Sequence, residues 1–224
     1  MGFTYRGHYI LIVITAFFPI TCFTSYTIAV LLDHVHALFP YISDTGTRAP
    51  ESCVFGFFLG IYALLTARAI RLRYQQVYYH YGDSNRRALL ILNKVAFITG
   101  WAAALGIYMV ANFQETNVLA VHLIGAFLAF IVDKVLIFAT IASKLQPDDP
   151  LKWGPGVKGY TEHVISTFLE WVVAFIATAF FLTFAKEFHK FEIKGEELNF
   201  LDIGSNFELN GKEENSVINE EIKY

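Results

Sequence analysis

The residues that could carry chemistry in this sequence are histidines, carboxylates and one serine placed in or beside long hydrophobic stretches. A metal-assisted hydrolase would need several such groups to meet at one point. No HExxH or GxSxG motif occurs, and no two of the histidine and carboxylate candidates are spaced i, i+4. The sequence therefore predicts no catalytic residue, no metal site and no cofactor. The candidates are, in chain order, Asp44, Glu51, His122, His163, Ser166 and Glu170.

Glu170 is the most informative of these candidates. It lies about a third of the way into a hydrophobic run, where an unpaired carboxylate is costly. It shares one helical face with His163 and Ser166, which precede it at i, i+3 and i+7 spacing, and Trp171 adjoins that face. We expect a donor on another helix to satisfy Glu170, with His122 as the first choice. Such a pair would be either structural or part of a ligand or proton site.

The elements that hold these residues are hydrophobic runs long enough to cross a bilayer, for which about 20 apolar residues suffice. The chain has 224 residues, is 55% hydrophobic and has a mean hydropathy of +0.45, which is more apolar than an ordinary soluble domain. We predict an all-α integral membrane protein with a membrane domain over residues 1–190. An acidic tail, 191–224, is expected to be largely disordered. The predicted spans are residues 9–32, 52–70, 88–111, 118–143 and 161–185, a bundle of five helices.

An arginine-rich segment between the second and third spans orients the bundle. It runs from Arg68 to Arg87 and contains five arginines against one acid, Asp83. Because arginine and lysine concentrate in short cytoplasmic loops, we expect this segment in the cytosol. Two short patterns resemble sorting signals, Tyr74–Val77 of the tyrosine type and Glu213–Ile218 of the acidic dileucine type. The net charge of −3 and the lack of a large basic patch argue against a nucleic-acid partner.

The predicted fourth span is unusual because it is overlong and carries Asp133 and Lys134 near its centre. Adjacent residues on a helix point about 100° apart, so these two side chains cannot simply face one another. Three alternatives explain this stretch: a functional pair, a tilted helix that reaches an interface, or a join between two incomplete spans. We favour the join. Five crossings would put the tail opposite a cytosolic N-terminus, whereas an even number would return it to the cytosol.

Residues 39–55, between the first two spans, have the composition of a fixed turn. Pro40 and Pro50 restrict the backbone, and Gly46 with its short polar neighbours favours a tight turn. Pro50 followed by Glu51 and Ser52 predicts the first turn of a helix. We expect this loop to fold as a cap on the lumenal or extracellular face.

The same loop resembles the first extramembrane loop of the DRAM family, the DNA-damage-regulated autophagy modulators, which belong to a wider group with the transmembrane-150 and post-GPI-attachment proteins. Segments 110–115, 120–130 and 162–184 are also similar to that family, so the resemblance covers most of residues 1–190. The tail beyond is not similar. The signature residues of the loop are Pro40, Tyr41, Ile42, Ser43, Asp44, Thr45, Gly46, Pro50, Glu51 and Ser52.

The resemblance implies six spans with both ends in the cytosol, so about one helix and its loop would be missing near Asp133. It also implies a lysosomal or endosomal membrane protein that promotes autophagy as a regulator and not as an enzyme. One alternative is a plasma-membrane regulator of phosphoinositide or lipid organisation. Another is a lipid-handling protein that uses the neighbourhood of His122 and Glu170. The expected partners are the lipid bilayer, a lipid ligand, and a second copy or another membrane protein.

Overall fold

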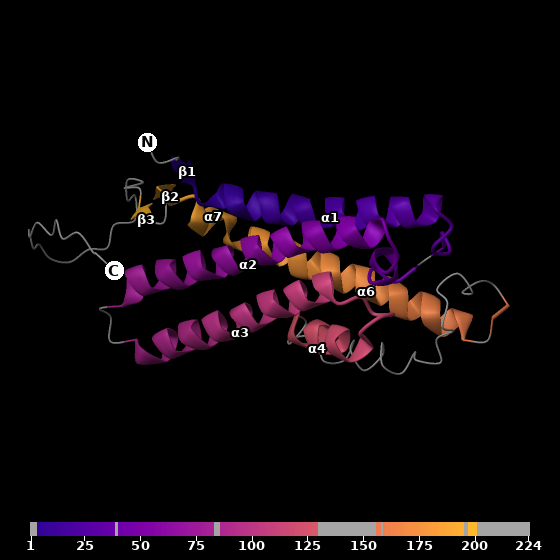
Figure 1. The fold of residues 1–224 in the computed structure, drawn as a ribbon. Coiled ribbons are helices and arrows are strands. Elements are labelled where there is room, and N and C mark those ends of the chain that lie inside the picture. Colours follow the sequence, from indigo (N-terminus) through magenta and orange to yellow (C-terminus); the bar gives the residue numbers. More distant parts are fainter. Residues whose placement is uncertain are drawn as a thin grey trace, which may run out of the picture.

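The computed structural model describes residues 4–200 apart from residues 39, 83–85, 130–155, 158 and 195–196. Four long helices dominate this part of the chain and run alongside one another (Figure 1). A shorter helix, α4 (Leu119–Ala129), packs against the third of them. The long helices are α1 (His8–Leu31), α2 (Glu51–Tyr81), α3 (Arg87–Asn112) and α6 (Tyr160–Phe180), the last continuing through the 3-10 turn η3 (Phe181–Phe184) into α7 (Ala185–Phe188).

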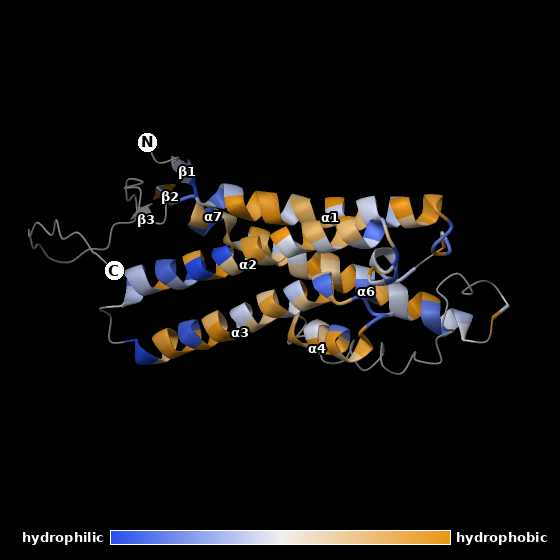
Figure 2. Ribbon diagram, viewed as in Figure 1, coloured by the Kyte–Doolittle hydropathy of each residue, from blue (hydrophilic) through white to orange (hydrophobic). Residues whose placement is uncertain are grey.

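Hydrophobic side chains cover the outside of these helices as well as the contacts between them. Figure 2 shows apolar residues along most of each long helix and hydrophilic residues concentrated where α2 ends and α3 begins. The segments α1, α2, α3 and α6–α7 are each long and apolar enough to cross a membrane. A water-soluble bundle would present a polar outer face. The predicted all-α integral membrane bundle is therefore confirmed.

Two predicted spans differ in length from the observed helices. The second, 52–70, is only the first part of α2, which continues to Tyr81 because its arginines, leucine and glutamines are good helix formers. The fourth, 118–143, begins as α4 at Leu119. The residues beyond Ala129, which include Asp133 and Lys134, lie outside the described part of the chain.

The core lies between α1, α2 and the last helix. Leu11 and Ile14 of α1 and Phe55 and Leu59 of α2 are buried in it. Helix α3 approaches α2 closely at Gly56, where a Cβ would lie 2.7 Å from the backbone oxygen of Ala111. The absence of a side chain at residue 56 therefore sets the spacing of α2 and α3.

A small antiparallel sheet closes one end of the bundle. Strand β1 (Thr4–Arg6) pairs with β2 (Phe191–Lys194), which pairs with β3 (Glu197–Phe200). The expectation that the tail is disordered from residue 191 onward is wrong for these two strands. Phe191 and Ile193 are fully buried while Glu192 between them is not, a period-two pattern that favours a strand.

The sheet places the two ends of the membrane domain together. Helix α7 lies beside the arginine-bearing half of α2, since Gln76 Nε2 donates to the carbonyl of Glu187 at 2.9 Å and Arg73 lies 4.7 Å over the ring of Phe184. The N-terminus, the end of α2 and β2 thus share one end of the molecule, and α3 ends and α6 begins toward the other (Figure 1). The pairing places residues 4–6 and 192–194 at one end of the bundle, whereas the five-crossing alternative would put the tail on the side of the membrane opposite the N-terminus. The stretch between α4 and α6 that determines the number of crossings includes residues 130–155, which lie outside the described part of the chain.

Candidate functional site: the loop-capped end of the bundle

Residues 40–52, which we call the signature loop, fold into the end of the bundle away from the sheet. Tyr41, Asp44 and Thr45 are buried, and residues 44–46 form the 3-10 turn η1 (Asp44–Gly46). A Cβ at Gly46 would lie 2.5 Å from Cδ1 of the buried Phe55 ring. The loop therefore packs its backbone against a core aromatic residue, and the predicted structured loop is confirmed.

Three of the polar candidates on α6 hold this loop. The amide of Ile42 donates to Glu170 Oε2 at 3.1 Å, and Trp171 Nε1 donates to the carbonyl of Pro40 at 3.0 Å. The ring of Tyr41 stands edge-on to the ring of His163, with centroids 4.9 Å apart. The predicted face of α6 is thus a docking surface for the signature loop.

The predicted pairing of Glu170 with His122 is wrong. His122 Nδ1 lies 2.7 Å from the carbonyl oxygen of Phe113, within the connection that leads into α4. Glu170 instead receives a backbone amide from the loop. A side chain on another helix was the expected donor, because a loop amide leaves no residue-type signal in the sequence. Ser166 is buried on α6 one turn before Glu170.

A second carboxylate, Glu115, ties the loop to the connection between α3 and α4. Ser43 Oγ donates to Glu115 Oε2 at 2.8 Å. The only sequence signal for this role is that Glu115 ends the segment 110–115 that resembles the DRAM family. Because of this contact, the loop joins three parts of the bundle, namely α1–α2, α3–α4 and α6.

Asp44 is the buried acid at the centre of the loop, with only 2% of its surface exposed. The pKa of its carboxyl group is raised to about 8, chiefly by burial and also by the nearby Glu115 carboxylate, while a hydrogen bond from the backbone of Tyr41 acts in the opposite direction. At neutral pH the Asp44 carboxyl group is therefore mostly protonated. A protonated carboxyl group can donate a hydrogen bond as well as accept one.

The remaining contacts anchor the loop to α1 and α2. Ser25 Oγ and Thr45 Oγ1 lie 3.0 Å apart, and Thr45 Oγ1 also donates to the carbonyl of Ile42 at 2.7 Å. Glu51 lies in the first turn of α2, as predicted, and is fully buried. Its Oε1 lies 2.5 Å from Nδ1 of His34, which forms an ion pair when the imidazole is protonated.

The arrangement is suited to holding a loop in place. Within the described residues, no group of three or more His, Cys, Asp or Glu side chains is placed to hold a metal ion. Beside the loop, Trp171 helps to line an apolar groove of about 670 Å³ between α1 and α6, together with Phe23, Tyr26 and Phe175. The polar groups of the site bind the loop, and the adjacent aromatic groove faces outward along the helices.

The fold and this site define a helical, multispanning membrane protein with a folded extramembrane cap. Residues 7–148 match the sequence profile described as the Frag1/DRAM/Sfk1/Cwh43P N-terminal domain. The match includes the signature loop, α1 to α4 and the connection that carries Glu115. The chain belongs to this family.

Similar proteins include DNA damage-regulated autophagy modulator protein 2 of Homo sapiens, which is 34% identical over 215 residues, covering 77% of this chain and 80% of that protein. DNA damage-regulated autophagy modulator protein 1 of Homo sapiens is 33% identical, covering 76% of this chain and 86% of that protein. Modulator of macroautophagy TMEM150B-B of Xenopus laevis is 46% identical over 97 residues, covering 43% of this chain and 39% of that protein. No solved structure matches the chain.

Proposed function

We propose that this protein is a non-enzymatic modulator of autophagy in the lysosomal or endosomal membrane. The observation that carries this proposal is the family match, because the signature residues of the family are the ones that build the cap. The relatives named above are modulators of autophagy by name. The cap uses its polar groups for contacts within the protein, which suits a regulator better than an enzyme.

The proposed location depends on which face of the bundle meets the cytosol. The arginines around the end of α2 favour the cytosol for that end, and the cap would then face the lumen. Tyr74–Val77 lies within α2, where Asn93 Nδ2 donates to the carbonyl of Tyr74 and Gln76 is buried, so it is not presented as an extended sorting peptide. Glu213–Ile218, which lies outside the described residues, is then the remaining sorting candidate, on a tail that leaves the bundle at the cytosolic end.

The proposal can be tested in cells that lack the protein, by re-expressing it and measuring autophagic degradation of a long-lived cargo together with its location. We expect the wild type to restore degradation from a lysosomal or endosomal membrane. Glu170→Gln should weaken the effect at equal expression, because Gln keeps one acceptor oxygen for the Ile42 amide but replaces the other carboxyl oxygen with an NH2 group. Glu162→Gln, an exposed carboxylate on the same helix, is the matched control and should behave as wild type.

Two outcomes would contradict the proposal. Degradation that is the same with and without the protein would remove the autophagy role. A plasma-membrane location with altered phosphoinositide distribution would favour the alternative regulator of lipid organisation.

The aromatic groove beside Trp171 favours a second candidate, a lipid-handling protein. In that case Glu170→Gln should abolish lipid movement across vesicles that contain the purified protein, while Glu162→Gln retains it. If neither variant nor the wild type moves lipid, this second candidate is eliminated and the autophagy assay is unaffected.

A further inference from the structure

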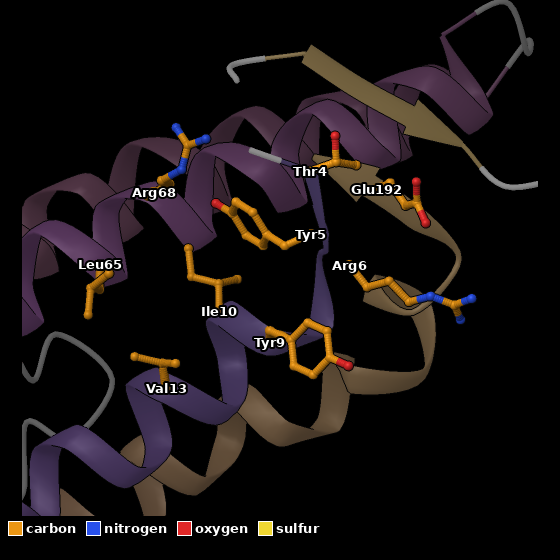
Figure 3. Close-up of a pocket in the computed structure, with 9 residues that line it drawn as sticks. All are labelled: Thr4, Tyr5, Arg6, Tyr9, Ile10, Val13, Leu65, Arg68 and Glu192. Carbon is orange, nitrogen blue, oxygen red and sulfur yellow. The ribbon is translucent and has the colours of Figure 1, made fainter. Parts of the chain in front are cut away.

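A second groove, of about 620 Å³, is lined by residues of β1, the first turns of α1, the middle of α2 and β2 (Figure 3). These elements meet at the end of the bundle opposite the cap, and none of them belongs to the signature loop (Figure 1). We propose that this groove binds one anionic phospholipid from the cytosolic leaflet. The phosphate of the headgroup would lie at Arg68, and an acyl chain would lie along Ile10, Val13 and Leu65.

The groove has a polar end and an apolar remainder, which match the headgroup and the acyl chain of a lipid. On α2, Arg68 lies about one turn beyond Leu65 toward the arginine-rich end of the helix. On α1, Val13 lies one turn deeper in the bundle than Ile10. Figure 3 shows the Tyr5 hydroxyl on the same side of the groove as Arg68, with Leu65 and Val13 farther along. A headgroup would thus meet a cation and a hydroxyl, and an acyl chain would meet the aliphatic side chains of Ile10, Val13 and Leu65.

The groove opens toward the bilayer. Tyr9 is 53% exposed and Val13 is 47% exposed, although both lie on a helix that is apolar enough to span the membrane. Ile10, in contrast, is buried and forms part of the floor. A lipid could therefore enter sideways from the leaflet, whereas a soluble anion would gain nothing from the aliphatic floor.

The charge of the groove complements an anionic headgroup. Arg6 and Glu192 line it from two paired strands and lie directly opposite each other in the β1–β2 register, so their formal charges cancel. The charged residues that line the groove are thus two arginines and one carboxylate, which gives the lining a formal net charge of +1. A guanidinium group matches the geometry of a phosphate with two parallel hydrogen bonds. Cytoplasmic leaflets are rich in anionic lipids, which attract basic residues near the surface.

The test uses the full chain in nanodiscs of phosphatidylcholine with a minor fraction of phosphatidylserine. Native mass spectrometry then counts the phosphatidylserine retained on the protein. We expect the wild type to retain phosphatidylserine in preference to phosphatidylcholine. Arg68→Gln should weaken this preference about fivefold, the loss of one basic contact. Arg71→Gln, an exposed arginine one turn along the same helix and outside the groove, is the matched control and should retain it.

Val13→Trp tests the acyl-chain position by filling the groove while leaving Arg68 in place. It should also lose the bound lipid. The proposal is overturned if the wild type shows no preference, if Arg68→Gln and Arg71→Gln lose the lipid equally, or if Val13→Trp retains it. Displacement of the lipid by inorganic phosphate would identify a site for soluble anions and would also overturn it. Each variant is compared at equal elution as a single folded species.

Discussion

Glu170 shows how one side chain can connect a loop to a membrane helix. The carboxyl group lies within a helix where polar groups are costly, and it receives the Ile42 amide at 3.1 Å. Trp171, the next residue, holds the carbonyl of Pro40. The two consecutive residues thus bind a donor and an acceptor of the same loop backbone, which fixes both its position and its direction.

We predict a graded loss of stability at this residue. Glu170→Ala leaves the loop amide without its acceptor and should cost about 2 kcal/mol, while Glu170→Gln keeps an acceptor oxygen and should cost about 1 kcal/mol. Thermal melting of the purified protein in detergent measures both, with Glu162→Gln as the control. A melting temperature of Glu170→Ala equal to that of Glu162→Gln would contradict the role given to this contact.

Asp44 gives the cap a pH dependence with a definite sign. Its pKa is raised from 3.8 to about 8 in the folded protein, so between these values the folded state binds a proton that the unfolded state releases. Stability should therefore fall as pH rises from about 4 to about 8, by at most about 1.4 kcal/mol per pH unit from this residue. Melting curves at pH 5 and pH 8 should show the higher stability at pH 5.

Asp44→Asn isolates this effect, because asparagine keeps the shape of the side chain and does not titrate. We expect the difference between pH 5 and pH 8 to shrink in Asp44→Asn and to persist in Asp33→Asn, an exposed acid just before the loop. An unchanged pH dependence in Asp44→Asn would mean that Asp44 does not cause it, which would contradict the role given to this carboxyl group.

At the scale of elements, the contact between α2 and α3 depends on a single missing side chain. A Cβ at Gly56 would lie 2.7 Å from the Ala111 backbone oxygen, whereas a Cβ at Gly60 would find its nearest neighbour, in Tyr108, at 3.8 Å. Substitution by alanine should therefore lower stability at Gly56 and be tolerated at Gly60, one turn farther along α2.

We expect Gly56→Ala to lower stability by about 1–3 kcal/mol, because a backbone atom cannot move aside for the new methyl group. Gly60→Ala should be neutral or slightly stabilising, since alanine favours helix and the space is open. The melting temperatures of the two purified variants measure both changes in stability. Equal destabilisation at both glycines would show that α3 does not approach α2 in this way.

The elements also show which features the sequence could predict. The hydrophobic runs predicted the long helices, and the prolines and Gly46 predicted a fixed loop. The arginine-rich segment was expected as a loop, but its first part continues α2 to Tyr81. The hydrogen bond from the Ile42 amide to Glu170 could not be predicted, because every residue except proline carries that donor. The strands at residues 191–200 were missed because Phe191 and Ile193 alternate over too short a segment to stand out within an acidic tail.

For the whole molecule, the sheet and the cap define two chemically different ends. One end gathers the arginines of α2 and α3, the N-terminal strand and the strands that follow α7. The other gathers the signature loop and the carboxyl groups of Asp44 and Glu115. The pairing of β1 with β2 places residues 4–6 and 192–194 at the same end of the bundle, away from the cap.

The sheet end and the capped end of the bundle should lie on opposite sides of the membrane. A native cysteine can be used to test this. The sequence contains two cysteines, of which Cys22 is buried and Cys53, beside the cap, is exposed. The measurement is labelling with a membrane-impermeant maleimide, together with antibody access to tags at the N- and C-termini, in cells whose plasma membrane alone has been permeabilised. Cys53→Ser is the labelling control. We predict that both tags are accessible and that Cys53 reacts only after the organelle membrane is opened. A C-terminal tag protected together with Cys53, while the N-terminal tag is accessible, would contradict the account.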